Sequence, residues 1–299
     1  MKIIPINLYK PQFTSTTRTT YICPTNGVFS TPSYNRGMTH RGNPDIRMIC
    51  SNSTNFFRKD LDWHKIGHTF NKQFPKGKVN IYDFACSDGS EAFSLVIALI
   101  EQLGEKKAQR FFPIIASDID SEIIRMANSG KIVATEEDMF QMKNMIKNEN
   151  IEKYFNITKL GGEKYLLSPK EILTKNVSFK QESIRHGVDD IQEDENNIIL
   201  ARNFWKYMSC EDIAKTSWKL AEKSNDKTLL LIGNFDLKKY ETPFFLAELG
   251  FDKLDDSNEN ILKFNSNFKR PACAENDKTW ERYIQSKYCE YIPTYLGKF

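Results

Sequence analysis

A turn of small residues at 83–89 (DFACSDG) has the features of a ligand site between a strand and a helix. The apolar run 79–84 leads into this turn, and a helix-like stretch begins directly after it at Ser90. Small side chains let a ligand approach the backbone, and a helix N-terminus offers free N–H groups with a partial positive charge. Taken alone, the segment fits a tight structural turn equally well.

The glycine content of this turn indicates the kind of ligand. Dinucleotide sites use the same geometry with the pattern G-x-G-x-x-G, because a pyrophosphate comes very close to the backbone. Here Gly89 is the only glycine, and Ala85, Ser87 and Ser90 are merely small. We therefore expect a ligand without a phosphate next to this turn, such as the methionine part of S-adenosylmethionine.

An acidic residue follows the next apolar run, at 113–117. In a doubly wound sheet, the end of this strand lies beside the first turn, and a carboxylate there can accept both ribose hydroxyls of a nucleoside. Asp118 is the predicted ribose ligand because it ends the strand. Asp120 is instead predicted to cap the helix that follows, with Glu122 in its first turn.

Four segments resemble, in the same order, those of the CheR-type chemotaxis protein-glutamate methyltransferases, a family that uses S-adenosylmethionine. Residues 52–58 (NSTNFFR) are similar to the family's N-x-T-x-F-F-R, and 85–94 (ACSDGSEAFS) to its A-C-S-T-G-E-E-P-Y-S. Residues 117–130 are similar to its D-I-D block with the following helix and glycine, and 201–207 (ARNFWKY) to C-R-N-x-x-x-Y. The resemblance extends roughly over residues 50–265, and the common order and spacing make a chance match improbable.

The resemblance implies a set of residues around S-adenosylmethionine. Glu91 would bind the amino group of the methionine moiety, and Asp118 would bind the ribose. Ser183 and Ile184 stand where the family has an Asn-Leu pair near the adenine. The implied cofactor-binding residues are Asn52, Thr54, Arg58, Gly89, Glu91, Asp118, Ser183, Ile184, Arg202 and Asn203.

The implied reaction is methyl transfer to a carboxylate, with a protein that bears a glutamate as the partner. Displacement at a sulfonium is in line, and a glutamate is ionised near neutral pH, so no general base is needed. The enzyme must align the two groups and exclude water. Arg58 and Tyr207 are the predicted catalytic residues, because an arginine fork can orient a carboxylate and the tyrosine would lie near the methyl group. A buried structural role fits Tyr207 equally well.

Three departures from the family pattern keep other functions open. Ser90 and Ala92 replace a Glu and a Pro, Ser183-Ile184 replaces Asn-Leu, and irregular residues 1–50 stand where the family has a helical basic domain. One alternative is a non-catalytic module that binds the cofactor. Another is a methyltransferase of the same fold that acts on a different protein or on a small molecule.

The elements that must position these residues alternate along the chain. Apolar runs predict strands at 79–84, 113–117, 177–180, 197–201 and 228–232, with a terminal hairpin of 251–254 and 261–264. Helical patterns between and after them fall at 90–103, 120–127, 136–148, 211–223 and 244–249. This alternation predicts an α/β, Rossmann-like class I methyltransferase fold, with a mostly parallel twisted sheet, helices on both faces and a C-terminal antiparallel hairpin.

Composition sets the wider expectations. We expect an irregular arm at 1–50, a methyltransferase domain at 51–265 and an aromatic-rich tail at 266–299. The net charge of +3 is too small to indicate nucleic-acid binding, and the longest apolar stretch, 95–100, is too short for membrane insertion. The N-terminus lacks a signal-peptide pattern, and the six scattered cysteines predict free thiols without a metal site, so a cytoplasmic protein is expected. The oligomeric state is not indicated.

Overall fold

A computed structural model describes residues 54–287, apart from 235, 237–241 and 256–258. The chain divides into the compact units Met1–Ser51 and Asn52–Phe299, and every described residue falls in the second. The predicted irregular arm at 1–50 and the predicted ligand Asn52 therefore lie outside the described residues.

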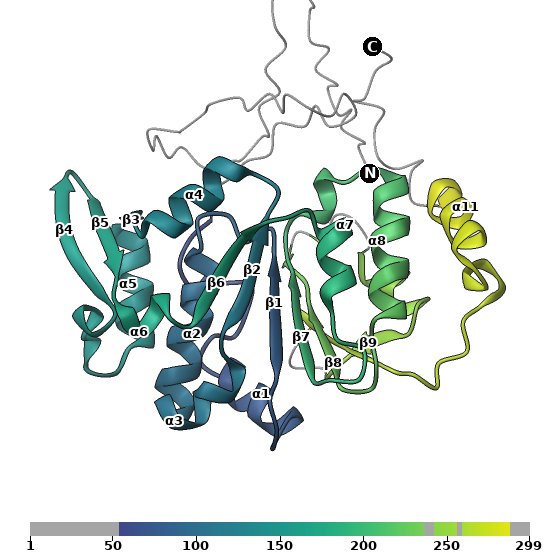
Figure 1. The fold of residues 1–299 in the computed structure, drawn as a ribbon, viewed down its shortest axis with the longest axis horizontal. Helices are drawn as coiled ribbons and strands as arrows, with labels where there is room; N and C mark the ends of the chain where they lie inside the picture. Colours follow the sequence, from purple (N-terminus) through teal and green to yellow (C-terminus); the bar gives the residue numbers. More distant parts are fainter. Residues whose placement is uncertain (1–53, 235, 237–241, 256–258, 288–299) are drawn as a thin grey trace, which may run out of the picture. The chain divides into compact units, whose positions relative to one another are not determined.

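A seven-stranded sheet forms the centre of this unit (Figure 1), with the strand order β6-β2-β1-β7-β8-β10-β9. Neighbouring strands from β6 to β8 are parallel, whereas β10 runs antiparallel to both β8 and β9. The predicted α/β fold with a C-terminal antiparallel hairpin is confirmed. The strands are β1 (Asn80–Phe84), β2 (Ile114–Asp118), β6 (Val177–Gln181), β7 (Asn197–Ala201), β8 (Thr228–Leu231), β9 (Phe251–Lys253) and β10 (Ile261–Phe264).

The strand order reverses beside β1, and this reversal fixes where a ligand can bind. In the central strand β1, Ile81 pairs with Ile114 of β2 on one side and with Ile198 of β7 on the other. The connection after β1 leads towards β2 on one side, and the connection after β7 leads towards β8 on the other side. The two connections therefore separate at the carboxyl ends of β1 and β7. Open α/β sheets bind ligands in the crevice outside such a reversal.

Helices cover both faces of the sheet (Figure 1), because alternate strand residues face opposite ways. Ile198 and Leu200 of β7 join the buried cluster under α2, while Ile199 and Ala201 join the cluster under α8. The helices are α1 (Ile66–Gln73), α2 (Ser90–Leu103), α3 (Glu105–Ala108), α4 (Ser121–Ser129), α5 (Glu136–Met145), α6 (Glu171–Thr174), α7 (Ile184–Gly187), α8 (Cys210–Glu222), α10 (Thr242–Ala247) and α11 (Asp277–Lys287).

Sequence patterns miss a small antiparallel sheet between α4 and β6. Its strand order is β3-β5-β4, formed by Ile132–Thr135, Lys164–Pro169 and Phe155–Gly161. Strand β4 reads FNITKLG, with Phe155 as its one fully buried residue, so it lacks the apolar run that marks the strands of the main sheet. Because most of these side chains are half-buried or exposed, hydrophobic periodicity gives little signal here.

The C-terminal segment also contains a helix that the sequence analysis does not predict. Helix α11 packs against α8, and its fully buried Trp280 donates from Nε1 to Ser217 Oγ at 3.0 Å. Short polar stretches separate α11 from the main sheet in the sequence, and the mean hydropathy of α11 is low. The sequence pattern of α11 is therefore weak, and its apolar side chains are buried through packing against α8.

Three general expectations can be compared with the described residues. Within them, no helix combines the length and hydropathy needed to cross a bilayer, and no cluster of three potential ligands is arranged around a metal position. Cys86 and Cys273 are free thiols, but Cys210 is disulfide-bonded. The expectation of free thiols is therefore wrong for Cys210, because cysteines far apart in the sequence can pair once the chain folds.

Candidate functional site

The turn after β1 has a backbone that L-residues rarely adopt. Ala85, Ser87 and Gly89 all have positive φ angles, of 57°, 53° and 88°. The left-handed region costs a non-glycine residue about 1–2 kcal/mol, so neighbouring contacts must hold this turn in place. The end of β2 supplies them, because Cys86 N donates to Ser117 O and Ser87 N donates to Asp118 Oδ2, both at 3.0 Å.

Gly89 has a packing reason in addition to its positive φ. A Cβ atom at this position would lie 2.6 Å from Cζ of Phe179, whose ring packs edge-on against Phe93 with 5.6 Å between the centroids. Glycine here therefore lets an aromatic side chain of β6 pack against the turn itself. This is a structural requirement beyond any role in ligand binding.

Gly89→Ala should lower the free energy of unfolding by about 2–4 kcal/mol, because backbone strain and overpacking add. Gly130→Ala is the matched control, since Gly130 also has a positive φ of 62° but its Cβ would meet Pro169 at an ordinary 3.5 Å. Urea unfolding of both variants measures the difference. Adding Phe179→Leu should recover part of the loss at Gly89, and equal costs for the two single variants would contradict this explanation.

Asp118 lies at the predicted position, at the carboxyl end of β2 beside the turn. Its buried carboxylate accepts Ser87 N through Oδ2 and Asp120 N through Oδ1, each at 3.0 Å, and burial raises its pKa. The predicted cap is confirmed, because Asp120 accepts from the N–H groups of Glu122 and Ile123 at the start of α4. Asp118 thus also fixes the turn, while its binding of a ribose stays a prediction.

The segment that carries Arg58 is held across α2 and α5 by its backbone. Phe56 N donates to Asp138 Oδ1 at 2.9 Å, and Phe57 N donates to Ser94 Oγ at 3.0 Å. Both phenylalanine side chains are buried in the core. Burial raises the pKa of Asp88 in the turn, hydrogen bonds from Ser90 oppose this rise, and the Arg58 charge adds a smaller effect in the same direction as Ser90. Half-buried Thr54 begins this segment.

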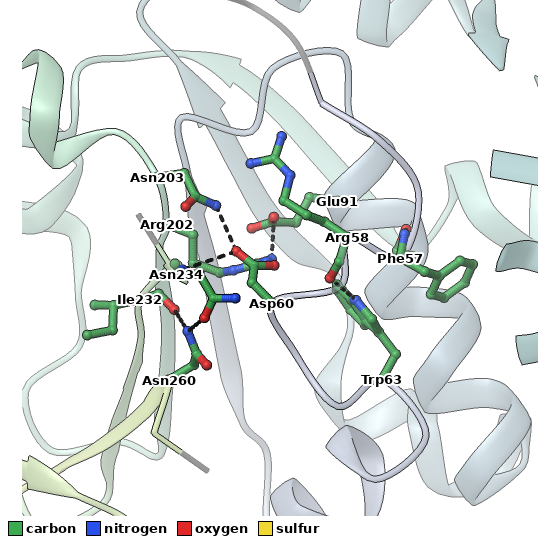
Figure 2. A network of polar contacts seen from close by, with 12 residues as sticks. Phe57, Arg58, Asp60, Trp63, Glu91, Arg202, Asn203, Ile232, Asn234 and Asn260 are labelled. Atoms are coloured by element: carbon green, nitrogen blue, oxygen red, sulfur yellow. Dashed lines mark hydrogen bonds and ion pairs between the residues drawn. The ribbon is translucent and has the colours of Figure 1, made fainter. Parts of the chain in front are cut away.

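A buried network at the ends of β7 and β8 brings together three of the predicted residues (Figure 2). Arg202 forms ion pairs with Glu91 of α2 and with Asp60, and Asn203 Nδ2 donates to Asp60 Oδ2 at 3.0 Å. The guanidinium also lies 5.7 Å from the centroid of the Trp63 ring. Sequence reasoning misses Asp60, whose one signal is its position two residues after Arg58.

Asp236 holds the two strand ends of this network together. Its Oδ2 accepts Asn203 N at 2.6 Å and Gly233 N at 2.8 Å, and burial raises its pKa to about 6. Asn203 has a positive φ of 61°, and a Cβ on Gly233 would lie 2.0 Å from its side chain. Glycine is therefore required at 233 for the two strand ends to approach this closely.

Acidic side chains outnumber basic ones in the buried part of the site. Asp83 of β1 is fully buried, and its carboxyl group lies within hydrogen-bonding reach of the Glu91 carboxyl group, while no N–H group of a described residue donates to it. Burial first, and then the charge of Glu91, raise its pKa well above the usual value, although Arg202 opposes the change. Asp60, Asp83 and Glu91 thus surround Arg202, the one buried basic side chain among the residues that the structure describes. A positively charged ligand would restore the balance, as the sulfonium and ammonium groups of S-adenosylmethionine would.

The other predicted residues lie beyond this network. Glu182 N donates to Asp118 O at 2.9 Å, which places Ser183 one residue past the contact with the end of β2. Ser183 caps α7 by accepting from Arg185 N at 3.3 Å, and Ile184 is partly buried against the cluster under α8. Tyr207 ends the 3-10 helix Trp205–Tyr207 and packs against the same cluster. Their contacts with a cofactor stay predictions.

Parallel strands whose order reverses beside β1, with buried acidic side chains towards the carboxyl ends of β1 and β2, define a Rossmann-like α/β protein with a candidate ligand site at that reversal. Comparison with known families identifies the class of protein, because the model described as "CheR methyltransferase, SAM binding domain" matches residues 52–246. The chain belongs to the CheR methyltransferase family, and its cofactor is S-adenosylmethionine.

Individual relatives are distant in sequence. A chemotaxis protein methyltransferase of Listeria monocytogenes is 24% identical over 207 residues, which cover 68% of this chain and 72% of the relative. A chemotaxis protein methyltransferase 2 of Vibrio cholerae is 25% identical over 195 residues, which cover 63% of each chain. Magnesium protoporphyrin IX methyltransferase from Synechocystis PCC 6803 with bound SAM matches with a TM-score of 0.32 and 13% identity, covering 67% of this chain and 75% of that one.

Proposed function

We propose that this chain transfers the methyl group of S-adenosylmethionine to the side-chain carboxylate of a glutamate in a protein substrate, and that residues 51–265 form the catalytic domain. The buried acidic excess around Arg202, next to the segment of Arg58, is the observation that carries this proposal. The relatives named chemotaxis protein methyltransferases support a protein as the acceptor.

In this proposal, acidic residues at the carboxyl edge of the sheet bind the cofactor. Asp118 accepts the ribose hydroxyls, Glu91 accepts the ammonium group of the methionine part, and Thr54 and Asn52 line the crevice from the N-terminal side. Ser183 and Ile184 lie on the adenine side. The negative charge of this set favours a cationic ligand over a nucleotide, whose phosphates the buried carboxylates would repel.

Bound S-adenosylmethionine supplies a methyl group on a sulfonium that is already activated for displacement. The protein must therefore orient the acceptor rather than remove a proton from it. In this proposal, Arg58 holds the incoming carboxylate and Tyr207 lies near the transferred group. Buried Phe56 and Phe57 anchor this segment over α2, which helps to exclude water.

Methyl-labelled S-adenosylmethionine, incubated with the purified chain and a cell extract, tests this function. Label that enters protein and is released by mild base indicates a carboxyl ester. Label that resists base indicates another acceptor, and cofactor binding without transfer indicates a non-catalytic module. If calorimetry detects no binding of S-adenosylmethionine or of its demethylated product, the proposal is wrong.

Arg58→Ala should lower turnover by about 100-fold through lost orientation of the acceptor, with a much smaller change in cofactor affinity. Lys59→Ala is the matched control, because Lys59 is the neighbouring cation and forms an exposed ion pair with Glu137 at 2.8 Å. Steady-state rates and calorimetry on both variants give the comparison. Unchanged turnover in Arg58→Ala would remove this residue from the site.

A further inference from the structure

Asp60 is a buried acid that joins three distant parts of the chain (Figure 2). Its side chain keeps 6% of its surface exposed and forms an ion pair with Arg202 through Oδ1. Its Oδ2 accepts Asn203 Nδ2 at 3.0 Å and Asn234 N at 3.4 Å. Burying a carboxylate is unfavourable unless it is paired, and Asp60 meets this condition by linking the segment of Arg58 to the ends of β7 and β8.

Arg202 is shared between two carboxylates, one at each end of its planar fork. Nη2 contacts Asp60 and Nη1 contacts Glu91 Oε2. The exposed fractions of the three side chains are 1% for Arg202, 6% for Asp60 and 12% for Glu91. Glu91 is thus the most exposed member of this trio, and the one that a ligand reaches most easily.

The pairing with Asp60 affects what Glu91 can bind. Without the Asp60 charge, Nη2 of Arg202 would lack an anion, and a guanidinium in that state favours a bidentate pair with the remaining carboxylate. Glu91 would then direct both oxygens to Arg202. Its capacity to accept a hydrogen bond from a cationic ligand would fall accordingly.

We propose that Asp60 is a positioning residue for the amino-acid part of the cofactor. By holding one end of Arg202, it leaves an oxygen of Glu91 for the ligand's ammonium group. The inference rests on the proposed role of Glu91, and it assigns to Asp60 an effect on one part of the ligand only.

Two ligands separate this role from a general structural one. S-adenosylhomocysteine carries the amino-acid part, whereas 5′-methylthioadenosine has the same nucleoside and a thioether but no ammonium group. Calorimetry should show that Asp60→Asn lowers the affinity for S-adenosylhomocysteine about 10- to 100-fold, which is the effect of losing one hydrogen bond to a charged group. The affinity for 5′-methylthioadenosine should change less than about 2-fold.

Matched variants complete the experiment. Asp62→Asn is the control, because Asp62 lies two residues further on and pairs with exposed Lys65 at 2.9 Å, and it should change neither ligand. Asp60→Ala is the second variant, in which added formate should restore much of the affinity for S-adenosylhomocysteine. If Asp60→Asn does not fold, the affinity of Asp60→Ala for S-adenosylhomocysteine with and without formate tests the proposed role of Asp60.

The outcomes are distinguishable. Equal losses for both ligands, or no loss for either, overturn the role of Asp60, as does an absence of formate rescue in Asp60→Ala. If the wild-type chain binds neither ligand, the proposed function itself is wrong. If the wild type binds both ligands and Asp60→Asn binds them with the same affinities, only the role of Asp60 is wrong.

Discussion

Arg202→Met should lower the free energy of unfolding by about 3–5 kcal/mol at about pH 8, the largest stability effect that we expect in this chain. The substitution preserves much of the volume but removes the single buried cation among Asp60, Asp83 and Glu91. The ion-paired carboxylates of Asp60 and Glu91 would then lack their counter-charge, and burial of Asp83 would no longer be opposed by the guanidinium. The structure predicts a strong destabilisation because Asp60 and Asp83 lie too deep for water to replace the guanidinium.

The pH dependence gives this prediction its sign. Burial raises the folded-state pKa of Asp83 and the Arg202 charge opposes this rise, so without Arg202 that pKa should lie still further above the unfolded value, and the variant should regain stability as pH falls. Urea unfolding at about pH 8 and about pH 5.5 measures the recovery. Adding Asp60→Asn and Glu91→Gln to Arg202→Met should recover much of the loss at the higher pH.

Arg125→Met is the control, because Arg125 forms an exposed ion pair with Glu122 at 2.8 Å. An exposed pair contributes about 0.2–1 kcal/mol, so this variant should unfold nearly as the wild type does. An Arg202→Met variant as stable as the control would contradict the buried network.

Asp83→Asn should stabilise the free protein at about pH 8 by about 1–2 kcal/mol. The same substitution should lower the affinity for S-adenosylmethionine about 10-fold. Burial raises the folded-state pKa of Asp83 above its ordinary value of 3.8, so the folded protein retains a proton that the unfolded chain has lost. Stability therefore falls as pH rises through that interval, and the amide removes this loss. Asp236, whose pKa is about 6, contributes a fall of the same sign that both proteins share.

Ligand binding should show the complementary effect. A cationic ligand favours the ionised form of Asp83, so wild-type affinity should rise with pH and binding should release protons. Calorimetry in buffers of different ionisation enthalpy measures this release, which should diminish in Asp83→Asn. Thermal unfolding from about pH 5 to about pH 8 measures the change in stability.

Asp226→Asn provides a contrast of opposite sign. Asp226 is exposed and accepts from Ser266 N and Oγ, which lowers its pKa. Its contribution to stability is present above the unfolded pKa and is lost as pH falls, so removing the charge should not stabilise the protein at the higher pH. If Asp83→Asn behaves like Asp226→Asn, then Asp83 is not a strained carboxylate.

The main sheet and its helices could be predicted because their signals are local. Buried parallel strands are continuous apolar runs, and Asn197–Ala201 is a strand with the predicted bounds, as Ser90–Leu103 is a helix with the predicted bounds. The cap at Asp120 also follows from local chemistry. The β3-β5-β4 sheet could not be predicted in this way, because half-exposed strands such as Phe155–Gly161 lack a strong apolar pattern.

By itself, the sequence determined the order of the elements, the turn at Gly89, the place of Asp118 and the resemblance to a methyltransferase family. The tertiary structure decided which charges meet. Asp60 and Arg202 are 142 residues apart, and their pairing depends on strand order and on the backbone bonds of Phe56 and Phe57. The burial of Asp83 beside Glu91, with no N–H donor among the described residues, was equally hidden, because neither burial nor a neighbour in space has a signal in a single residue's type. Electrostatic balance depends on distances through space, which only the folded chain defines.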